Sequence, residues 1–482
     1  MSTAAPTKTP AGIEAAVARL KASLGDKGVI ADPAGMAPYL VEQRELYQSN
    51  ARLVLRPSST AEVAASVKLC AETGIPIYPQ GGNTGLCGGA VAAADGVLLS
   101  LARLNKVRAI DPVNFTIIVE AGCVLAEVQR AAAAADRLFP LSLGAEGSCM
   151  IGGNLSTNAG GINVLRYGNM RELTLGLEVV MADGQVWNGL RSLRKNNTGY
   201  DLKHLFIGGE GTLGIITAAV LKLFPRPREI ETAFLGLKRV EDVMALFARA
   251  REVSGDQLTG FELVPRIGLE TAIKFGEKVA DPLPSRHDWY VLLEVSSSQK
   301  DSGLRAALED FLSQAMADDL VQDGTLAASA QQAKELWRIR ALLAELQTAQ
   351  GGSIKHDVSV PVSRVADFIL AANAAVSARL PGIRPFPFGH AGDGNIHYNL
   401  TQPVGADKAA YLARWEEFNR IVHDIVIGLG GSISAEHGIG LVKREELAHY
   451  AQPLELELMG RIKRAFDPKG IMNPGKLLKS AP

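Results

Sequence analysis

Two histidines in the C-terminal third of the chain have a spacing that could bind a metal ion. His390 and His397 flank an Asp-Gly pair in a segment that reads GHAGDGNIHYN. Asp393-Gly394 is typical of a two-residue hairpin turn, because glycine tolerates the positive φ angle that such turns require. Counting outward from this turn places the two imidazoles opposite each other, where they could bind one divalent ion, with Asn399 on the same strand face. The pattern fits either a metal-binding hairpin or two ordinary polar residues beside a turn.

A second segment, SAEHGIG, supplies a carboxylate beside another histidine. Glu436 would complete a set of two imidazoles and one carboxylate, which suits Zn²⁺ or a similar divalent ion and leaves positions open for a substrate. This set alone would also fit a metal-dependent hydrolase, and a carboxylate here could instead cap the following turn. His437 is a candidate general base, because histidine has an ordinary pKa of about 6.5. The residues themselves do not separate it from His423 or His449.

Three glycine-rich loops occupy the first half of the chain. They read PQGGNTGLCGG from Pro79, LGAEGSCMIGGNLSTNAGG over 143–161, and FIGGEGTLGIIT from Phe206. Glycines let backbone N–H groups surround an anion without interference from Cβ atoms, although flexible surface loops have the same composition. The third loop contains a G-x-G-x-x-G spacing, but a dinucleotide fingerprint needs a helix directly after its glycines. The β-branched run over 215–221 predicts a strand instead, which argues against a Rossmann domain.

The elements that must position these residues alternate between helix and strand. Ser59 followed by Glu62 is a capping box that begins a helix. Hydrophobic patterns predict helices over 11–24 and 304–317 and strands over 53–55, 75–78 and 289–295. Because the strand over 75–78 runs directly into the first glycine loop, we expect the loops to lie at strand ends.

Composition limits the classes of function. A chain of 482 residues is too long for one core, so we expect two or three domains. With 50 basic and 51 acidic residues, the chain has no electrostatic footprint for nucleic acid. Its four cysteines form no C-x-x-C pair, and it lacks an apolar run of about 18 residues that could span a membrane. Because Met1–Pro10 also lacks the apolar segment of a signal peptide, we expect a cytoplasmic protein with reduced thiols that acts on small molecules.

The three loops together resemble the FAD-binding domain of the vanillyl-alcohol oxidase / p-cresol methylhydroxylase (PCMH) superfamily. The closest resemblance is to the branch that holds D-2-hydroxyglutarate dehydrogenase, D-lactate dehydrogenase and the glycolate oxidase flavoprotein subunit. It covers the chain from about residue 45 to Leu478, and it implies an α+β fold. The expected parts are an N-terminal helical segment (1–44), a two-part PCMH-type FAD-binding domain (45–227), a ferredoxin-like substrate or cap domain (228–425) and a helical C-terminal segment (426–482).

The resemblance implies a set of FAD-binding residues in the loops and near the C-terminus. They are Pro79, Gly81, Gly82, Asn83, Thr84, Gly85, Leu86, Gly147, Gly153, Asn154, Thr157, Asn158, Ala159, Gly211, Gly214, Ile216 and Asn473. Asn83 stands where some members carry a histidine that attaches FAD covalently, so we expect non-covalent FAD. The NPGK motif at 473–476 implies that the C-terminus returns to the FAD domain.

The resemblance also assigns roles in the oxidation of a D-2-hydroxy acid. It implies a divalent metal such as Zn²⁺ on His390, His397 and Glu436, and His437 as the base that takes the hydroxyl proton. Arg340, Lys355 and Asn399 would bind and orient the substrate.

Two cationic anchors, Arg340 and Lys355, favour a substrate with two carboxylates, most simply D-2-hydroxyglutarate. Hydroxyglutarate enzymes carry a threonine one turn after the arginine, however, where this chain has Ala344. D-lactate and glycolate therefore stay open as substrates, as does a non-catalytic flavin-binding subunit of a larger complex. The family implies an electron acceptor such as an electron-transfer flavoprotein or a quinone, and a homodimer is possible.

Overall fold

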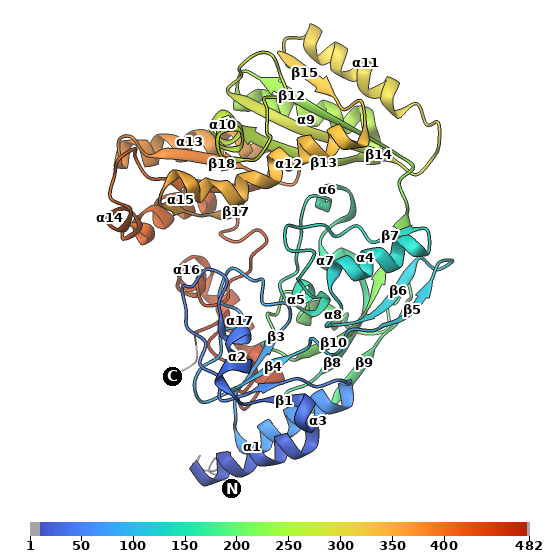
Figure 1. Ribbon diagram of the computed structural model, residues 1–482, viewed down its shortest axis with the longest axis vertical. Helices are drawn as coiled ribbons and strands as arrows, with labels where there is room; N and C mark the ends of the chain where they lie inside the picture. Colours follow the sequence, from blue (N-terminus) through green and yellow to red (C-terminus); the bar gives the residue numbers. More distant parts are fainter. Residues whose placement is uncertain (1–9, 480–482) are drawn as a thin grey trace. The chain divides into compact units, whose positions relative to one another are not determined.

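The chain forms two compact units in the computed structural model, which describes residues 10–479 (Figure 1). Of these, the first unit holds residues 10–160, 169–225 and 437–479, and the second holds 161–168 and 226–436. Residues 161–168 and 426–436 thus belong with the expected cap domain rather than with the segments to which the sequence assigned them. The prediction that Met1–Pro10 is not a signal peptide concerns residues 1–9, which lie outside the described ones, and Pro10.

The first unit contains a small sheet that leads into the first glycine loop. Its strands, in spatial order, are β1 (Val29–Ile30), β2 (Val54–Leu55), β4 (Val97–Ser100) and β3 (Ile77–Gln80). Helix α3 (Thr60–Thr73) connects β2 to β3, and its N-terminal Glu62 N–H donates to Ser59 Oγ at 3.2 Å. The predicted capping box is only half formed, because the Glu62 carboxylate accepts from the N–H of Ser58 at 2.7 Å rather than from that of Ser59.

A five-stranded antiparallel sheet forms the second part of this unit. In spatial order its strands are β5 (Val107–Asp111), β6 (Thr116–Glu120), β10 (Ile215–Lys222), β8 (Thr174–Val180) and β9 (Val186–Gly189). The central strand β10 directly follows Gly214 and is buried over almost its whole length. The third glycine loop therefore opens a strand, which confirms that it is not a Rossmann fingerprint.

The C-terminal segment belongs to this first unit. After α16 (Arg444–Tyr450) and α17 (Pro453–Phe466), the chain runs beside β3, where Ile77 N–H donates to Ile471 O and Asn473 N–H donates to Ile77 O, each at 2.8 Å. The C-terminal segment therefore lies in the same unit as the three glycine loops. Predicted helix 11–24 is α1 (Pro10–Leu24), with Leu20 and Leu24 buried.

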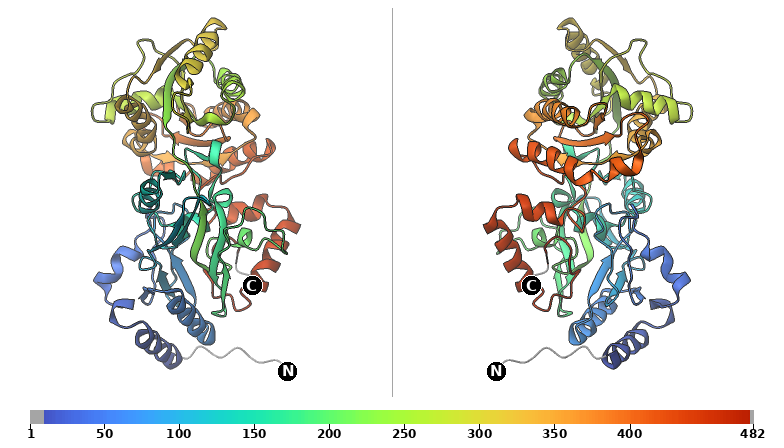
Figure 2. Two further views of the ribbon diagram at one scale, coloured as in Figure 1. Left: turned by 90° about the vertical axis from the view of Figure 1, so that its right-hand side faces the viewer. Right: turned by 90° about the vertical axis from the view of Figure 1, so that its left-hand side faces the viewer.

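The second unit has the predicted ferredoxin-like topology (Figure 1 and Figure 2). All its pairs are antiparallel, and the strand order is β13 (Leu258–Pro265), β14 (Trp289–Ser297), β12 (Glu229–Leu237) and β15 (Asp323–Leu326). Helices α9 (Val240–Ser254) and α11 (Leu304–Ala317) pack on one sheet face, and α10 (Arg266–Phe275) and α12 (Ala330–Leu346) pack on the other. Side chains alternate between these faces, so Glu262 on β13 points to the same side as Val264, toward α12.

A smaller sheet in this unit carries the histidine motif. Strand β19 (Asn395–Thr401) pairs with β16 (Ser353–Ile354), β17 (Asp357–Ser359) and β18 (Arg384–Phe388). Helices α13 (Val365–Arg379) and α15 (Trp415–Gly428) pack against each other beside it. Gly389, which follows β18, exchanges two backbone hydrogen bonds with Leu263 of β13, so the two sheets meet at the histidine motif.

The remaining elements are short. They are α2 (Pro33–Leu40), α4 (Leu125–Ala134), α5 (Ile151–Ser156), α6 (Val164–Tyr167), α7 (Met170–Leu173), α8 (Lys203–Phe206), α14 (Lys408–Leu412), β7 (Arg137–Leu138), β11 (Phe224–Pro225) and 3₁₀ turns at Asp26–Gly28, Gly255–Gln257, Gln347–Gln350 and Val362–Arg364. Among residues 10–479, no helix is long and apolar enough to cross a membrane. The four cysteines are free and buried.

Candidate active site

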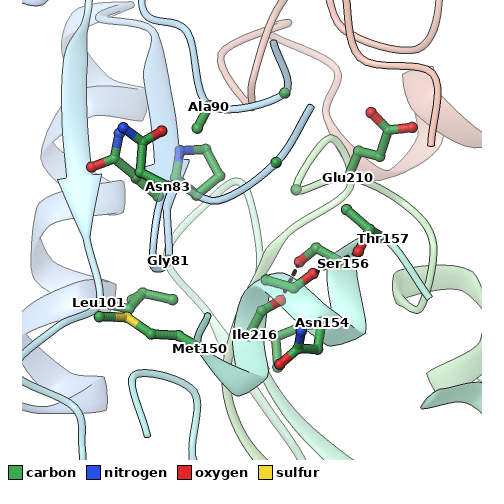
Figure 3. Close-up of a pocket in the computed structure, with 18 of the residues that line it drawn as sticks. Gly81, Asn83, Ala90, Leu101, Met150, Asn154, Ser156, Thr157, Glu210 and Ile216 are labelled. Atoms are coloured by element: carbon green, nitrogen blue, oxygen red, sulfur yellow. Dashed lines mark hydrogen bonds between the residues drawn. The ribbon is translucent and has the colours of Figure 1, made fainter. Parts of the chain in front are cut away.

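A pocket in the first unit is lined by all three glycine loops (Figure 3). The residues predicted for FAD that line it are Pro79, Gly81, Gly82, Asn83, Thr84, Gly85, Gly153, Asn154, Thr157, Gly211, Gly214 and Ile216. Five others, Leu86, Gly147, Asn158, Ala159 and Asn473, are not among its lining residues. The three loops that the resemblance assigned to one cofactor therefore converge on one cavity.

The glycines of this pocket allow two backbones to approach closely. A Cβ on Gly82 would lie 2.2 Å from the carbonyl oxygen of Ser148, so no other residue fits between the first and second loops. Gly211 has a φ of +70°, and a Cβ there would lie 2.6 Å from Cγ of Pro79. At Gly85 and Gly153 a Cβ would meet no atom within 4 Å, so bare backbone faces open space. Exposed backbone of this kind suits the pyrophosphate of a dinucleotide.

Two asparagines of the pocket differ in how they are bonded. Asn83 has a φ of +56°, and its Nδ2 donates to Val41 O at 2.6 Å, so its side chain anchors the loop. Asn154 Oδ1 is buried and has no hydrogen-bond partner among the described residues. A buried acceptor without a donor is costly, so this oxygen fits a hydrogen bond from a bound ligand. The residues present therefore fit FAD.

Glu210 is a buried residue of this pocket that the sequence analysis missed. Its carboxylate accepts the N–H groups of Ile439 and Gly440 at 2.8 and 2.7 Å, and thus holds the glycine segment that follows His437. Burial raises the pKa of Glu210, and these two N–H groups act against that rise. The residue lies inside the GGEGTLG motif, in which only the glycines and the following strand were interpreted from the sequence.

The histidine hairpin is wider than predicted. The Cα partner of His397 in the strand pair is Phe388, not His390, and residues 389–394 form the connection. The prediction of a two-residue turn at Asp393-Gly394 is therefore wrong. The cause is Gly389, whose hydrogen bonds to the neighbouring strand β13 end the pairing with β19 before the turn.

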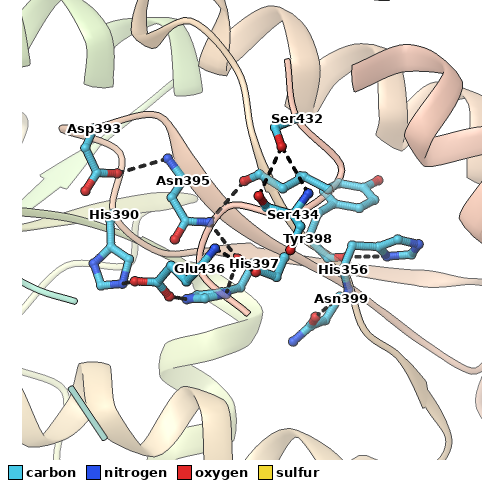
Figure 4. A network of polar contacts seen from close by, with 12 residues as sticks. His356, His390, Asp393, Asn395, His397, Tyr398, Asn399, Ser432, Ser434 and Glu436 are labelled. Atoms are coloured by element: carbon cyan, nitrogen blue, oxygen red, sulfur yellow. Dashed lines mark hydrogen bonds and ion pairs between the residues drawn. The ribbon is translucent and has the colours of Figure 1, made fainter. Parts of the chain in front are cut away.

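The wider loop still brings the predicted metal ligands together (Figure 4). His390 Nε2 lies 3.8 Å from Glu436 Oε1, and His397 Nε2 lies 3.9 Å from Glu436 Oε2. One ligand atom of each residue lies within 4.8 Å of the other two. These separations leave room for an ion about 2.0–2.2 Å from each donor. Both imidazoles present Nε2 to this space. The donor set therefore fits Zn²⁺.

A buried carboxylate that the sequence analysis missed joins this cluster to the predicted substrate arginine. Glu262 Oε1 lies 2.7 Å from His390 Nδ1, and Arg340 Nε donates to Glu262 Oε2 at 2.6 Å. Burial alone would raise the pKa of Glu262, but the adjacent charges of His390 and Arg340 outweigh it and lower the pKa to about 2. Burial would likewise lower the pKa of His390, but Glu262 and Glu436 raise it to about 9.

Asp357 and Asn395 hold the other side of the cluster. Asp357 Oδ2 accepts the backbone N–H of Glu436 at 3.0 Å, and its Oδ1 accepts from Asn395 Nδ2 at 3.0 Å. Asn395 Nδ2 also donates to Val358 O at 3.0 Å. These bonds fix the backbone at Glu436 to strand β17. The Glu436 carboxylate is therefore held by a second layer of hydrogen bonds, as the His390 imidazole is by Glu262.

Comparison with known proteins decides the family. Residues 226–477 match the C-terminal domain of FAD-linked oxidases, and residues 51–189 match an FAD-binding domain. This chain belongs to the FAD-linked oxidases. The match to an FAD-binding domain is at odds with a metal-dependent hydrolase.

Named relatives of this FAD-linked oxidase are D-2-hydroxyglutarate dehydrogenases. A probable mitochondrial one from Oryza sativa subsp. japonica is 41% identical over 96% of this chain and 81% of the relative. A bovine mitochondrial one is 39% identical over 93% of this chain and 81% of the relative, and one from Xanthomonas citri pv. viticola is 37% identical over 93% and 94%. The predicted branch of the superfamily is therefore confirmed.

Solved structures confirm the predicted fold class. Substrate-bound p-cresol methylhydroxylase superposes with a TM-score of 0.75 at 16% identity, over 98% of both chains. The isoeugenol complex of 4-ethylphenol oxidase from Gulosibacter chungangensis superposes with a TM-score of 0.72 at 19% identity, over 99% of both chains. At such low identity these likenesses concern the fold alone.

In this FAD-linked oxidase the predicted substrate residues have different surroundings. Arg340 is buried and lies over the ring of Phe388, whereas Arg338 is exposed, as predicted from their spacing on the helix. Ala344, one turn later, is exposed. Since Glu262 engages only Nε of Arg340, the two terminal nitrogens can bind a substrate carboxylate.

The other two predicted substrate residues lie on the small sheet. Lys355 is half-buried and lies between β16 and β17 rather than within a strand. Asn399 is buried on β19, where its Nδ2 donates to Gln347 Oε1 at 2.7 Å and its Oδ1 accepts from the His356 N–H at 3.3 Å. The roles of these residues, and of His437 directly after Glu436, stay predictions.

Proposed function

We propose that this FAD-linked oxidase converts D-2-hydroxyglutarate to 2-oxoglutarate with the help of a bound divalent metal, for which Zn²⁺ is the best candidate. The observation that carries the proposal is one connected cluster in the second unit. It contains three metal donors, His390, His397 and Glu436, and a buried arginine suited to a carboxylate. Relatives that carry this activity in their names support it.

In this proposal the chain binds and orients a hydroxy acid for the loss of two hydrogens from its C2–OH unit. When bound, the metal supplies a Lewis acid that lowers the pKa of the substrate hydroxyl, and FAD supplies the acceptor for the C2 hydride. His390, His397 and Glu436 would hold the metal, and the glycine loops would hold FAD without a covalent bond. His437 takes the hydroxyl proton on its imidazole nitrogen.

The carboxylates of the substrate have separate anchors. The two terminal nitrogens of Arg340 bind one carboxylate through parallel hydrogen bonds, while the Lys355 ammonium binds the other as a point charge. Asn399 orients the substrate, because its bonds to Gln347 and His356 use only one hydrogen of Nδ2 and one lone pair of Oδ1. Such fixed positioning is a major part of the expected rate acceleration.

A substrate panel tests the proposed specificity. Turnover with an artificial acceptor dye is measured on D- and L-2-hydroxyglutarate, D-lactate and glycolate. We expect the highest kcat/KM for D-2-hydroxyglutarate and no turnover of the L-enantiomer. A higher kcat/KM for D-lactate or glycolate would move the protein to the alternative that Ala344 favours, since this residue lacks the hydroxyl that could bind a second carboxylate. No turnover of any of them would support a non-catalytic subunit.

Metal removal tests the metal separately. We expect exhaustive chelation to abolish turnover while the flavin absorbance stays, and added Zn²⁺ to restore it. Turnover that is unchanged by chelation would contradict the metal proposal. Two predictions rest on the family alone. One is that the electron acceptor is an electron-transfer flavoprotein or a quinone, and the other is a homodimer.

A further inference from the structure

Glu262 is a single carboxylate in the middle of a strand whose other side chains carry no charge. Strand β13 reads LTGFELVP and is buried at every position, and the Glu262 side chain is 1% exposed. A carboxylate in such a place is costly unless it is fully paired. Among the described residues, the basic side chains that contact this carboxylate and can neutralise its charge are His390 and Arg340.

Each oxygen of this carboxylate serves one of these two residues. Because a carboxylate can only accept, His390 Nδ1 must carry the hydrogen, and its Nε2 is then the nitrogen that faces Glu436 and His397. The second oxygen accepts from Arg340 Nε, which fixes the plane of the guanidinium. One residue thus sets both the tautomer of a metal ligand and the direction of a carboxylate anchor.

The backbone around Glu262 makes this arrangement rigid. Leu263 N–H donates to Gly389 O at 2.8 Å, Gly389 N–H returns the bond at 3.2 Å, and Gly392 N–H donates to Phe261 O at 3.2 Å. The two residues that flank Glu262 are therefore bonded to Gly389 and Gly392, which lie before and after the pair His390-Ala391. The same bonds end the pairing between β18 and β19 at Phe388. They also place the His390 imidazole beside the Glu262 carboxylate.

We propose that Glu262 is a positioning residue that couples the metal site to the carboxylate-binding arginine, by holding His390 Nε2 toward the metal and Arg340 toward the substrate. The proposal rests on the proposed function for the roles of these two partners. Outer carboxylates that bind a metal-ligating histidine typically change metal affinity by about 10–100-fold when removed. Here the same substitution should also weaken substrate binding, because the second oxygen holds Arg340.

The chain offers a matched control in Glu294. This half-buried carboxylate lies on the adjacent strand β14 and is also bonded to helix α12, where Trp337 Nε1 donates to it at 2.6 Å. Its other partners are the hydroxyls of Thr232 and Thr259. Glu294→Gln therefore replaces a half-buried carboxylate on the same sheet, bonded to the same helix, without touching His390 or Arg340.

The test measures zinc affinity by competition with a chromogenic chelator, on apo-metal protein with its flavin in place and without substrate. A glutamine can accept from only one of the two donors and turns an NH₂ group toward the other. We expect Glu262→Gln to weaken zinc binding about 10–100-fold and to raise KM for D-2-hydroxyglutarate more than it lowers kcat at saturating zinc. Glu294→Gln should keep wild-type zinc affinity. Wild-type zinc affinity in Glu262→Gln, or an equal loss in both variants, would overturn the proposal.

A second variant covers the case in which Glu262→Gln does not fold. Glu262→Asp keeps the charge that neutralises Arg340, but its shorter side chain cannot reach both partners at once. We expect it to fold and to lose zinc affinity relative to wild type; unchanged affinity would also overturn the proposal. Because zinc affinity is read without substrate, a wild-type protein that does not oxidise D-2-hydroxyglutarate would refute the proposed function and leave this result standing.

Discussion

The glycine pocket and the cluster around His390, His397 and Glu436 use different parts of the chain: the first is made of backbone and the second of side chains. The pocket presents backbone at Gly82, Gly85 and Gly153, and its special property is the absence of Cβ atoms. The cluster consists of side chains, and its core is a buried carboxylate shared by His390 and Arg340. Backbone groups without Cβ atoms allow the close approach of a large cofactor. A few precisely placed polar side chains instead fix the orientation of a small ligand.

This difference predicts opposite sensitivities to substitution. The pocket should tolerate the exchange of one side chain for another but not an added methyl group where two loops touch. The cluster should tolerate changes of bulk nearby but not the loss of a single ligand or charge. Four variants test this difference. The first two are read by both flavin binding and zinc binding, and the last two are read by the KM of the substrate.

The largest effect is expected for His397→Ala in the cluster. Metal Lewis-acid catalysis contributes several kcal/mol of transition-state stabilisation, so we expect kcat/KM to fall by about 10³-fold or more. Zinc content measured by atomic spectroscopy should fall, while the flavin absorbance of the purified protein stays at the wild-type level. A variant with normal zinc content and activity within tenfold of wild type would show that the cluster is not the metal site.

The converse effect is expected for Gly82→Ala in the pocket. The added Cβ would lie 2.2 Å from Ser148 O, which is backbone and cannot rotate away. Overpacking of this kind costs about 1–3 kcal/mol, so FAD should bind about 10–100-fold more weakly while zinc affinity is unchanged. Gly144→Ala is the control from the same loops, because its Cβ would meet no atom within 4 Å. Full flavin content in Gly82→Ala would contradict the close approach of these two loops.

An intermediate effect that depends on the substrate is expected for Lys355→Ala. A hydrogen bond to a charged group contributes about 1.5–3 kcal/mol, so KM for D-2-hydroxyglutarate should rise about 10–100-fold. KM for D-lactate, which has no second carboxylate, should not change. The comparison is made by steady-state kinetics on both substrates, and an equal loss on both would refute the role of Lys355 at the distal carboxylate.

The smallest effect is expected for Ala344→Thr. Ala344 lies one turn after Arg340 on α12 and is exposed, so a threonine fits without repacking. Because this position is exposed to solvent, one added hydrogen bond is worth only about 0.5–1.5 kcal/mol, and KM for D-2-hydroxyglutarate should therefore fall about 2–10-fold. An unchanged KM would mean that this position does not face the substrate.

The same difference explains what could be predicted from the sequence. Glycine runs can be read directly from the sequence, so the three loops and the family could be recognised without a structure. The β-branched run over 215–221 predicted the strand that follows Gly214. The family resemblance implied the ferredoxin-like domain. His390, His397 and Glu436 could be grouped by residue type, although Glu436 is distant in sequence and the family was needed to single out His437 and Arg340.

The features that could not be predicted depend on tertiary contacts. The Asp393-Gly394 signal is local, and it was overridden by backbone hydrogen bonds between Gly389 and Leu263. Glu262 was missed because a lone acidic residue in a strand is ordinarily a solvated one. Its one available signal was the run of uncharged neighbours, which marks β13 as buried on both faces.

The most direct test of the central claim is an anaerobic single-turnover experiment, which asks whether both regions act on one substrate. D-2-hydroxyglutarate is mixed with zinc-loaded and with chelated protein, and the flavin absorbance is followed. We predict rapid bleaching in the zinc-loaded protein and none on this timescale in the chelated protein, with L-2-hydroxyglutarate inactive in both. Equal bleaching of the two forms, or no bleaching of the zinc-loaded form, would contradict the account.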